Sequence, residues 1–209
     1  MGKNLEHPEF FRLGITIIYA IVIALSIDAS KTIFIPFYSI PANLLNAIIL
    51  FYGYFLIITG WIEYHFLTQK FNETSRSILP TFVIEIGILF LFYYIVMAGS
   101  ENGADYLIPD VYLFVTPLIF LLLTLKDVFN ISNHKNENLV SYRNLSRNFL
   151  FISLIISLSY IAETYATAFQ SFGLFAFYRD LIFAFLTLTL IFLYRILRWR
   201  KINSASTTS

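Results

Sequence analysis

A glutamate inside an almost unbroken apolar run is the first feature that could do chemistry. Glu163 stands in the stretch LSYIAETYATAFQ. A charge near the centre of a bilayer costs about 2.5 to 3.5 kcal/mol, so such a group normally faces protein, water or a partner. Helical periodicity places Glu163 on a polar stripe, with Tyr160 at its edge, together with Ser159, Thr167 and Gln170. The stripe is either the lining of an ion path or a carboxylic acid that neighbouring hydroxyls satisfy or that burial keeps protonated.

Two further glutamates lie in apolar runs. Glu85, in FVIEIGILF, has Thr81 as its nearest polar neighbour on the same helix face, so a neutralising group must come from another helix. Glu63, in GWIEYHFL, is predicted within one turn of a membrane surface, where it can reach water or meet a base. His65 is two positions away and lies on a different helix face, which leaves only a faint candidate for a hydrolase. The sequence therefore predicts no enzyme and no catalytic residue.

An arginine near the predicted outer surface could neutralise Glu163. Asp28, Lys31, Arg179 and Asp180 are expected at the outer ends of the first and last helices. Arg179 can reach toward Glu163 if the last two helices form a tight hairpin. Such a pair is structural more often than conductive, because it removes the free charge that an ion needs. An ion pair between Glu163 and Arg179 is thus the structural alternative to an ion path.

The composition is that of a polytopic membrane protein. Of 209 residues, 58% are hydrophobic and 13% are charged, and the mean hydropathy is +0.72; soluble domains carry roughly 25% charged residues. There is no cysteine, which excludes disulfides and thiolate metal sites. His7, His65 and His134 fall at or outside the predicted membrane surface, which excludes a transmembrane bis-histidine haem. Phosphate-binding loops and basic domains are also absent, so we expect no cofactor, no metal site and no nucleic-acid partner.

Apolar stretches of about 20 residues, the length that crosses ~30 Å of hydrocarbon, predict an all-α fold. The predicted transmembrane helices of this single integral membrane domain, residues 1–209, are 10–28, 43–66, 79–99, 110–127, 148–170 and 174–197. If both termini are cytosolic, twelve of the fourteen lysines and arginines lie on the cytosolic side, and only Lys31 and Arg179 lie outside. The sequence thus predicts a multi-pass protein of the cell membrane, with a polar cytosolic loop at 126–147.

The first two predicted helices carry a family resemblance. IIYAIVIALSI followed by FYGYFLIITGWIEYHFL resembles the start of the bacterial six-helix potassium channels of the transmembrane protein 175 type. In that family an apolar AIxIT run follows a Phe-Ser-Asp signature, and helix two ends with Trp and His. The matching residues here are Ala20, Ile21, Ile23, Leu25, Trp61 and His65.

The same stretch departs from the family pattern at its signature. Gly14, Ile15 and Thr16 stand where Phe-Ser-Asp would be, and Ala24 replaces the threonine of the run. The resemblance covers about a quarter of the chain. It implies a tetramer whose first helices line a cation pore, with apolar side chains such as Ile23 at the constriction, where a hydrophobic gate is physically feasible.

Two classes of function stay open. The first is a cation channel or small transporter, whose ion path follows the apolar face of the first helix or the Glu163 stripe. The second is a non-transporting membrane partner or anchor that acts through the 126–147 loop. The expected partners are the lipid bilayer, further copies of the chain in a homo-oligomer and, for the first class, an inorganic cation. The candidate residues of an ion path are Glu163, Ser159, Tyr160, Thr167, Gln170, Glu85 and Ile23.

Overall fold

A computed structural model gives the fold of the chain. It describes residues 7–34, 44–70, 75–100, 110–133, 137–167 and 173–204. These residues form six helices: α1 (His7–Phe34), α2 (Leu44–Lys70), α3 (Ser75–Gly99), α5 (Val111–Asn133), α6 (Glu137–Thr167) and α7 (Gly173–Ser204). The all-α expectation is therefore confirmed.

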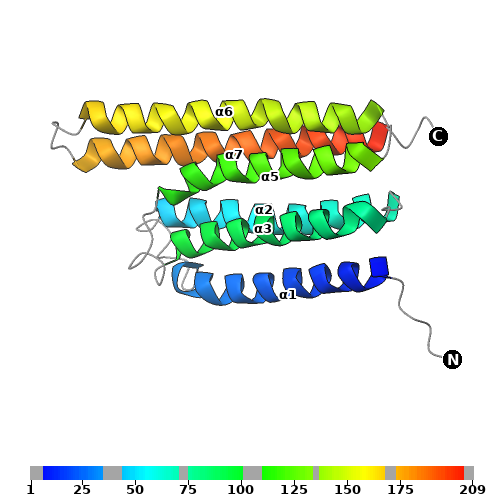
Figure 1. Ribbon diagram of the computed structural model, residues 1–209. Helices are drawn as coiled ribbons and strands as arrows, with labels where there is room; N and C mark the ends of the chain where they lie inside the picture. The colour runs from blue at the N-terminus through cyan, green and yellow to red at the C-terminus, as the bar shows by residue number, and fades with distance from the viewer. Residues whose placement is uncertain are drawn as a thin grey trace.

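Each of these helices is long and apolar enough to cross a membrane. The shortest candidate span has 19 residues and the longest has 27, against the roughly 20 residues that span the hydrocarbon core. Helices that follow one another in the chain run in opposite directions, and α1 begins on the side of the bundle where α7 ends (Figure 1). We call this side the termini side and the other the opposite side. Six helices of this length and composition are compatible with a multi-pass membrane protein.

Hydroxyl side chains fit into these apolar helices by bonding to their own backbone. The Thr116 hydroxyl donates to the carbonyl of Tyr112 at 2.6 Å, and Thr187 donates to Phe183 at 2.8 Å. Such bonds to the preceding turn satisfy a polar group that the membrane interior would otherwise leave without a partner. The bundle therefore tolerates threonine at buried positions.

The segment 126–147, expected to be a cytosolic loop, is mostly helical. Helix α5 continues to Asn133 and α6 begins at Glu137, so the two helices form a hairpin. The expectation of a loop was wrong because its polar residues were read as solvated, whereas several face the interior of the bundle. Lys126, Asp127 and Ser146 are buried.

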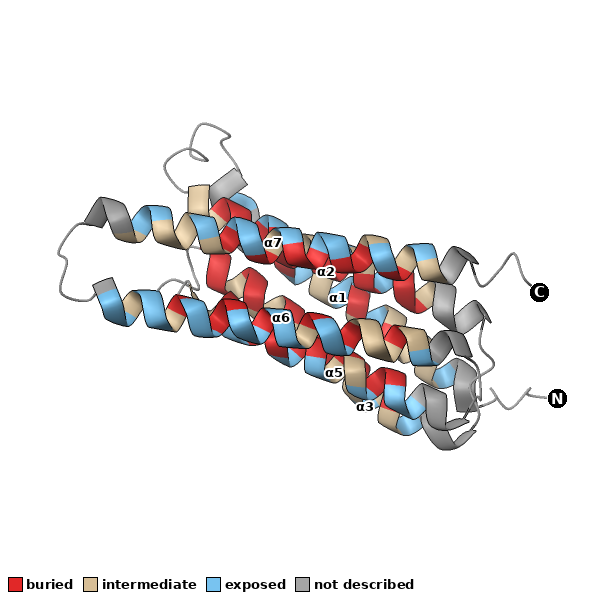
Figure 2. Cartoon of the chain, turned by 90° about the horizontal axis from the view of Figure 1, so that it is seen from above, coloured by how far each residue is buried: buried red, intermediate tan, exposed pale blue. Residues whose placement is uncertain are grey.

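Five of the described helices close into a ring. Helix α2 contacts α3, α3 contacts α5, α5 contacts α6, α6 contacts α7, and α7 contacts α2. Helix α1 packs against α2 and α3 at the edge of the bundle (Figure 1). Buried residues lie on the faces that the helices turn toward one another, and exposed residues lie on the outer faces (Figure 2). Side chains from all sides therefore meet inside the ring.

Two glycines of α2 permit the closest approach to its neighbours. A Cβ atom on Gly53 would lie 2.5 Å from Val96 of α3, and one on Gly60 would lie 2.8 Å from Phe92. The same Cβ on Gly60 would lie 3.1 Å from the Tyr19 hydroxyl of α1. Small residues at such positions let membrane helices pack backbone against side chain.

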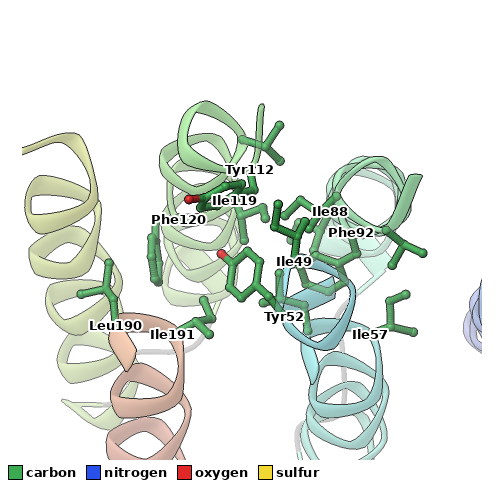
Figure 3. Packing of buried hydrophobic residues seen from close by; sticks show 14 of the residues in the cluster. Ile49, Tyr52, Ile57, Ile88, Phe92, Tyr112, Ile119, Phe120, Leu190 and Ile191 are labelled. Carbon is green, nitrogen blue, oxygen red and sulfur yellow. The ribbon is translucent and has the colours of Figure 1, made fainter. Parts of the chain in front are cut away.

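A layer of large apolar side chains fills the middle of the bundle. Phe92 of α3, Ile119 and Phe120 of α5, and Ile191 of α7 are fully buried, with 0% of their surface exposed. Figure 3 shows these side chains facing Tyr52 of α2. We call this group, with Leu56 and Ile57 of α2, the apolar layer. It separates two polar regions, one near each end of the bundle.

Candidate functional site

A network of charged side chains is buried on the termini side of the apolar layer. It contains three acids and three bases from the described residues: Glu63, Glu85, Asp127, Lys126, Arg195 and Arg198. Their exposed fractions run from 1% for Arg198 to 6% for Lys126. We call these six residues the termini-side network. Its formal charges cancel, as burial in a membrane requires.

Arg198 of α7 holds one half of this network. Its Nε donates to Glu63 of α2 at 2.6 Å, and its two terminal nitrogens donate to the two carboxylate oxygens of Asp127 of α5, each at 2.9 Å. Hydroxyls of Tyr194 and Ser146 lie 2.7 and 3.0 Å from the same guanidinium. A planar guanidinium with five donors suits this fork geometry, whereas a lysine would not.

Arg195 completes this half from the preceding turn of α7. It donates to the second carboxylate oxygen of Glu63, so two arginines bind one glutamate. Ser146 also donates to Asp127 at 2.8 Å, which ties α6 into the same group. Four helices, α2, α5, α6 and α7, are therefore joined through Arg198 and its partners.

The other half of the network is built from Glu85 and Lys126. The ammonium of Lys126 on α5 lies 2.6 Å from Oε2 of Glu85 on α3. The Tyr19 hydroxyl of α1 donates to Oε1 of the same glutamate at 3.0 Å. The neutralising group for Glu85 thus comes from another helix, as its sequence surroundings require. With hydrogen bonds from Tyr19 of α1 and Ser146 of α6, each of the six described helices either belongs to the network or bonds to it.

A small polar cavity lies between the two halves. Its volume is about 10 Å³, and its charged and polar lining consists of Tyr19, Glu63, Glu85, Lys126 and Arg195. Nε of Arg195 has no hydrogen-bond partner among the described residues. A polar cavity of roughly 10–15 Å³ is large enough for a single water molecule. The space therefore suits one water or one small cation among ionised groups.

Between the apolar layer and the opposite side, polar groups occur as isolated pairs. The hydroxyls of Tyr52 and Thr116 lie 2.7 Å apart, and Ser157 donates to the carbonyl of Leu113 at 2.6 Å. These groups are uncharged and satisfied locally. They do not connect to the termini-side network, because Ile119, Phe120 and Ile191 lie between them along α5 and α7.

A second charged group lies near the opposite side and is only partly buried. Nη2 of Arg179 lies 2.7 Å from Oδ1 of Asp180, and the guanidinium stacks 4.9 Å above the ring of Tyr160. The Tyr160 hydroxyl donates to Asp180 at 3.2 Å. Asp110, which precedes α5, faces the same group. We call Asp110, Tyr160, Arg179 and Asp180 the opposite-side cluster.

The electrostatics of this cluster act most visibly on Asp110. Burial raises the pKa of Asp110 above its ordinary value, and the neighbouring charge of Asp180 raises it further. The nearby Tyr160 hydroxyl and the charge of Arg179 lower the pKa, but they do not outweigh burial. The cluster therefore has two carboxylates and one base, and it favours a protonated Asp110 more than open solvent does.

The Glu163 stripe faces outward. Ser159 and Glu163 are exposed on the outer face of α6, and Tyr160 turns inward to the opposite-side cluster. Glu163 lies within one turn of Ala166, the end of the candidate span. A carboxylate there can reach the polar headgroups. The side chain of Thr167 and all of Gln170 lie outside the described residues.

The remaining predicted site residues are dispersed. Glu85 belongs to the termini-side network, and Ile23 of α1 is half-buried against the apolar core. Arg179 is paired with Asp180, and its pairing with Glu163 stays a prediction. Among the predicted candidates, Glu85 is thus the one placed among buried charges of other helices.

The sequence did not single out Lys126, Asp127, Arg195 and Arg198 as site residues, and the three bases among them were counted with the charges of the cytosolic side. Their spacing carried a signal. In α7 the buried positions run Ile191, Tyr194, Arg195 and Arg198, which is the spacing of one continuous helix face. Continuing the apolar face past the end of the apolar run would have turned these charges inward.

Comparison of the chain with models of protein families, with curated proteins and with solved structures finds no match in any of the three.

Proposed function

We propose that the protein is a small transporter for an inorganic cation and that the termini-side network is its ion-coupling site. The observation that carries the proposal is the burial of six charges, contributed by α2, α3, α5 and α7, inside an apolar bundle. Buried ion pairs are seldom needed for stability, since apolar replacements of similar volume are often neutral or stabilising by about 1–4 kcal/mol. Ionisable groups within membrane spans typically mark ion pathways or proton relays.

A carrier is favoured over an open channel by the apolar layer. Fully buried side chains such as Phe92, Ile119 and Ile191 stand between the network and the opposite side. An ion that reaches the cavity from the termini side meets this layer next. Passage then requires the helices to rearrange around the site, which is the behaviour of a transporter.

The distribution of charged residues supports an orientation in the membrane, and the family resemblance supports a class of ion. The distribution of lysine and arginine supports a cytosolic termini side in the cell membrane, which puts the network in the cytosolic half. The resemblance of the first two helices to channels of the transmembrane protein 175 type supports a monovalent cation and a homo-oligomer. The outer face of α1, with Ile17, Ile21 and Leu25 exposed, is available for contacts between copies.

The alternative of a non-transporting partner loses support from the packing of 126–147. Lys126, Asp127, Tyr142 and Ser146 of this segment are buried in the chain's own interior. A docking surface for another protein would need its distinctive groups outside.

The test is cation flux into proteoliposomes. Purified wild type should carry potassium or sodium above the rate of empty liposomes. Glu85→Gln should abolish most of this flux, because it removes the carboxylate that lines the cavity. Glu163→Gln is the matched control, since it makes the same chemical change on the outer face of α6, and it should leave the flux unchanged. Absence of cation flux from folded, inserted wild type would overturn the proposal.

A further inference from the structure

We propose that the Glu85–Lys126 pair is an exchange site at which one proton and one monovalent cation replace each other. This inference rests on the proposed transport function and goes further, since it names the coupled ion and the group that carries it. It is drawn from the chemistry of the three buried bases and from the cavity beside them.

The three bases of the network differ in whether they can release a proton. Arg195 and Arg198 keep their charge at any physiological pH, because the guanidinium does not deprotonate in proteins. Lys126 can lose a proton and become a neutral amine. Its pairing with Glu85 favours the charged form, so the proton leaves when a cation takes its place beside the carboxylate. Lys126 is thus the base of the network whose charge can change. It lines the cavity and lies 2.6 Å from Glu85.

Charge balance determines what the network must bind when Lys126 loses its proton. With Lys126 protonated, the three acids and three bases of the network cancel. When an N–H bond of Lys126 breaks and the proton passes to water that enters the cavity, the network holds one unbalanced negative charge. A monovalent cation on Glu85 restores neutrality. The reverse step returns the proton to the amine nitrogen as the cation leaves.

The surroundings of the pair supply suitable ligands. Glu85, Glu63 and Tyr19 all line the cavity, and the Tyr19 hydroxyl donates to Oε1 of Glu85. Oxygen ligands replace the hydration shell of an alkali cation in ion channels. Arg195 and Arg198 of α7 are paired with Glu63 and Asp127, so their charges are already balanced. The network with a neutral Lys126 therefore lacks one positive charge, and a single monovalent cation supplies it.

The exchange is electroneutral, which separates it from channel conduction. The first experiment loads proteoliposomes with a pH-sensitive dye and applies potassium or sodium outside. Cation entry should be matched by an equal loss of protons from the lumen, and a voltage-sensitive dye should report no potential. Cation flux without proton movement would overturn the exchange site and leave the transport proposal standing. No cation flux at all would overturn both.

Lys126→Arg is the decisive variant, since it preserves a positive charge beside Glu85 and removes the releasable proton. It should lower both ion movements by at least about tenfold. The matched control is Lys31→Arg, the same change at an exposed ion pair with Asp28, and it should exchange at the wild-type rate. Exchange by Lys126→Arg at the wild-type rate would overturn the inference.

A second variant keeps the test valid if arginine does not fit at position 126. The double substitution Glu85→Gln with Lys126→Met removes both members of the pair and leaves Glu63, Asp127 and the arginines balanced. Folding can be checked by size-exclusion chromatography and thermal unfolding. The folded double variant should carry neither ion, and retained exchange would overturn the proposal.

Discussion

The two charged regions of the molecule differ in burial, in net charge and in the number of helices that they join. The termini-side network is nearly inaccessible, is neutral in sum and receives side chains from four helices of the ring in addition to α1. The opposite-side cluster is partly exposed, with 13% of the Arg179 side chain and 18% of the Asp180 side chain accessible, and joins α6, α7 and the start of α5. Charges are thus satisfied by one another where water is excluded, and by solvent as well where the bundle ends.

The largest effect is expected from removing Arg198. Arg198→Met would leave Glu63 with one base and Asp127 with none of its guanidinium bonds, which should destabilise the fold by about 3–5 kcal/mol. Thermal unfolding in detergent should show a clear fall in Tm. Arg200→Met, on an exposed position of the same helix, is the control and should leave the Tm nearly unchanged. An equal Tm for the two variants would contradict a structural role for the Arg198 pairs.

The second prediction tests whether Glu85 and Lys126 stabilise the fold as a pair or as two independent charges. Glu85→Leu or Lys126→Met alone leaves a buried charge without its partner and should destabilise by about 3–5 kcal/mol. The double variant Glu85→Leu with Lys126→Met should recover most of that loss, because an apolar pair of similar volume needs no partner. A double-mutant cycle on unfolding free energies measures the recovery. Additive losses would mean that the two side chains do not depend on each other.

A smaller effect is expected on the opposite side. Arg179→Gln removes the base between Asp110 and Asp180, but these carboxylates keep access to water, so the loss should be about 1 kcal/mol or less. The Tm of this variant should lie much closer to wild type than that of Arg198→Met. A loss as large as that of Arg198→Met would erase the distinction between the two regions.

The smallest effect concerns pH. Because burial raises the pKa of Asp110, its protonated form favours the folded state. This stabilisation of the folded state is complete below pH 3.8, the ordinary pKa of an aspartate, and is lost as the pH rises through the raised pKa of Asp110. Asp110→Asn should therefore be slightly more stable than wild type at neutral pH, by less than about 1 kcal/mol because solvent reaches the group. The stability advantage of the variant should vanish in acid, and unfolding curves at several pH values measure it. A stability difference that does not change with pH would show that burial of Asp110 is not the cause.

Much of the fold was predictable from local sequence. Six apolar stretches long enough to cross a membrane appear as six helices, because in a membrane a helix is the structure that satisfies every backbone group within one segment. The lack of a polar neighbour beside Glu85 also required a partner on another helix, and Lys126 is that partner.

The site was much less predictable, because a charge near the end of an apolar run fits two environments. Lys126 and Arg198 could lie at the headgroups or turn inward, and both placements agree with their positions along the chain. Glu163 was weighed as an interior carboxylate, yet it lies on the outer face of α6.

The sequence by itself determined the number, length and apolar character of the helices, since these depend on residues that are near one another in the chain. Tertiary structure alone decided which charges face the interior, because that depends on the rotation of each helix about its axis. Arg198 meets Glu63 and Asp127 across 135 and 71 positions of the chain. Packing at Gly53 and Gly60 brings α2 against α3, and that contact helps to enclose the network that no single segment encodes.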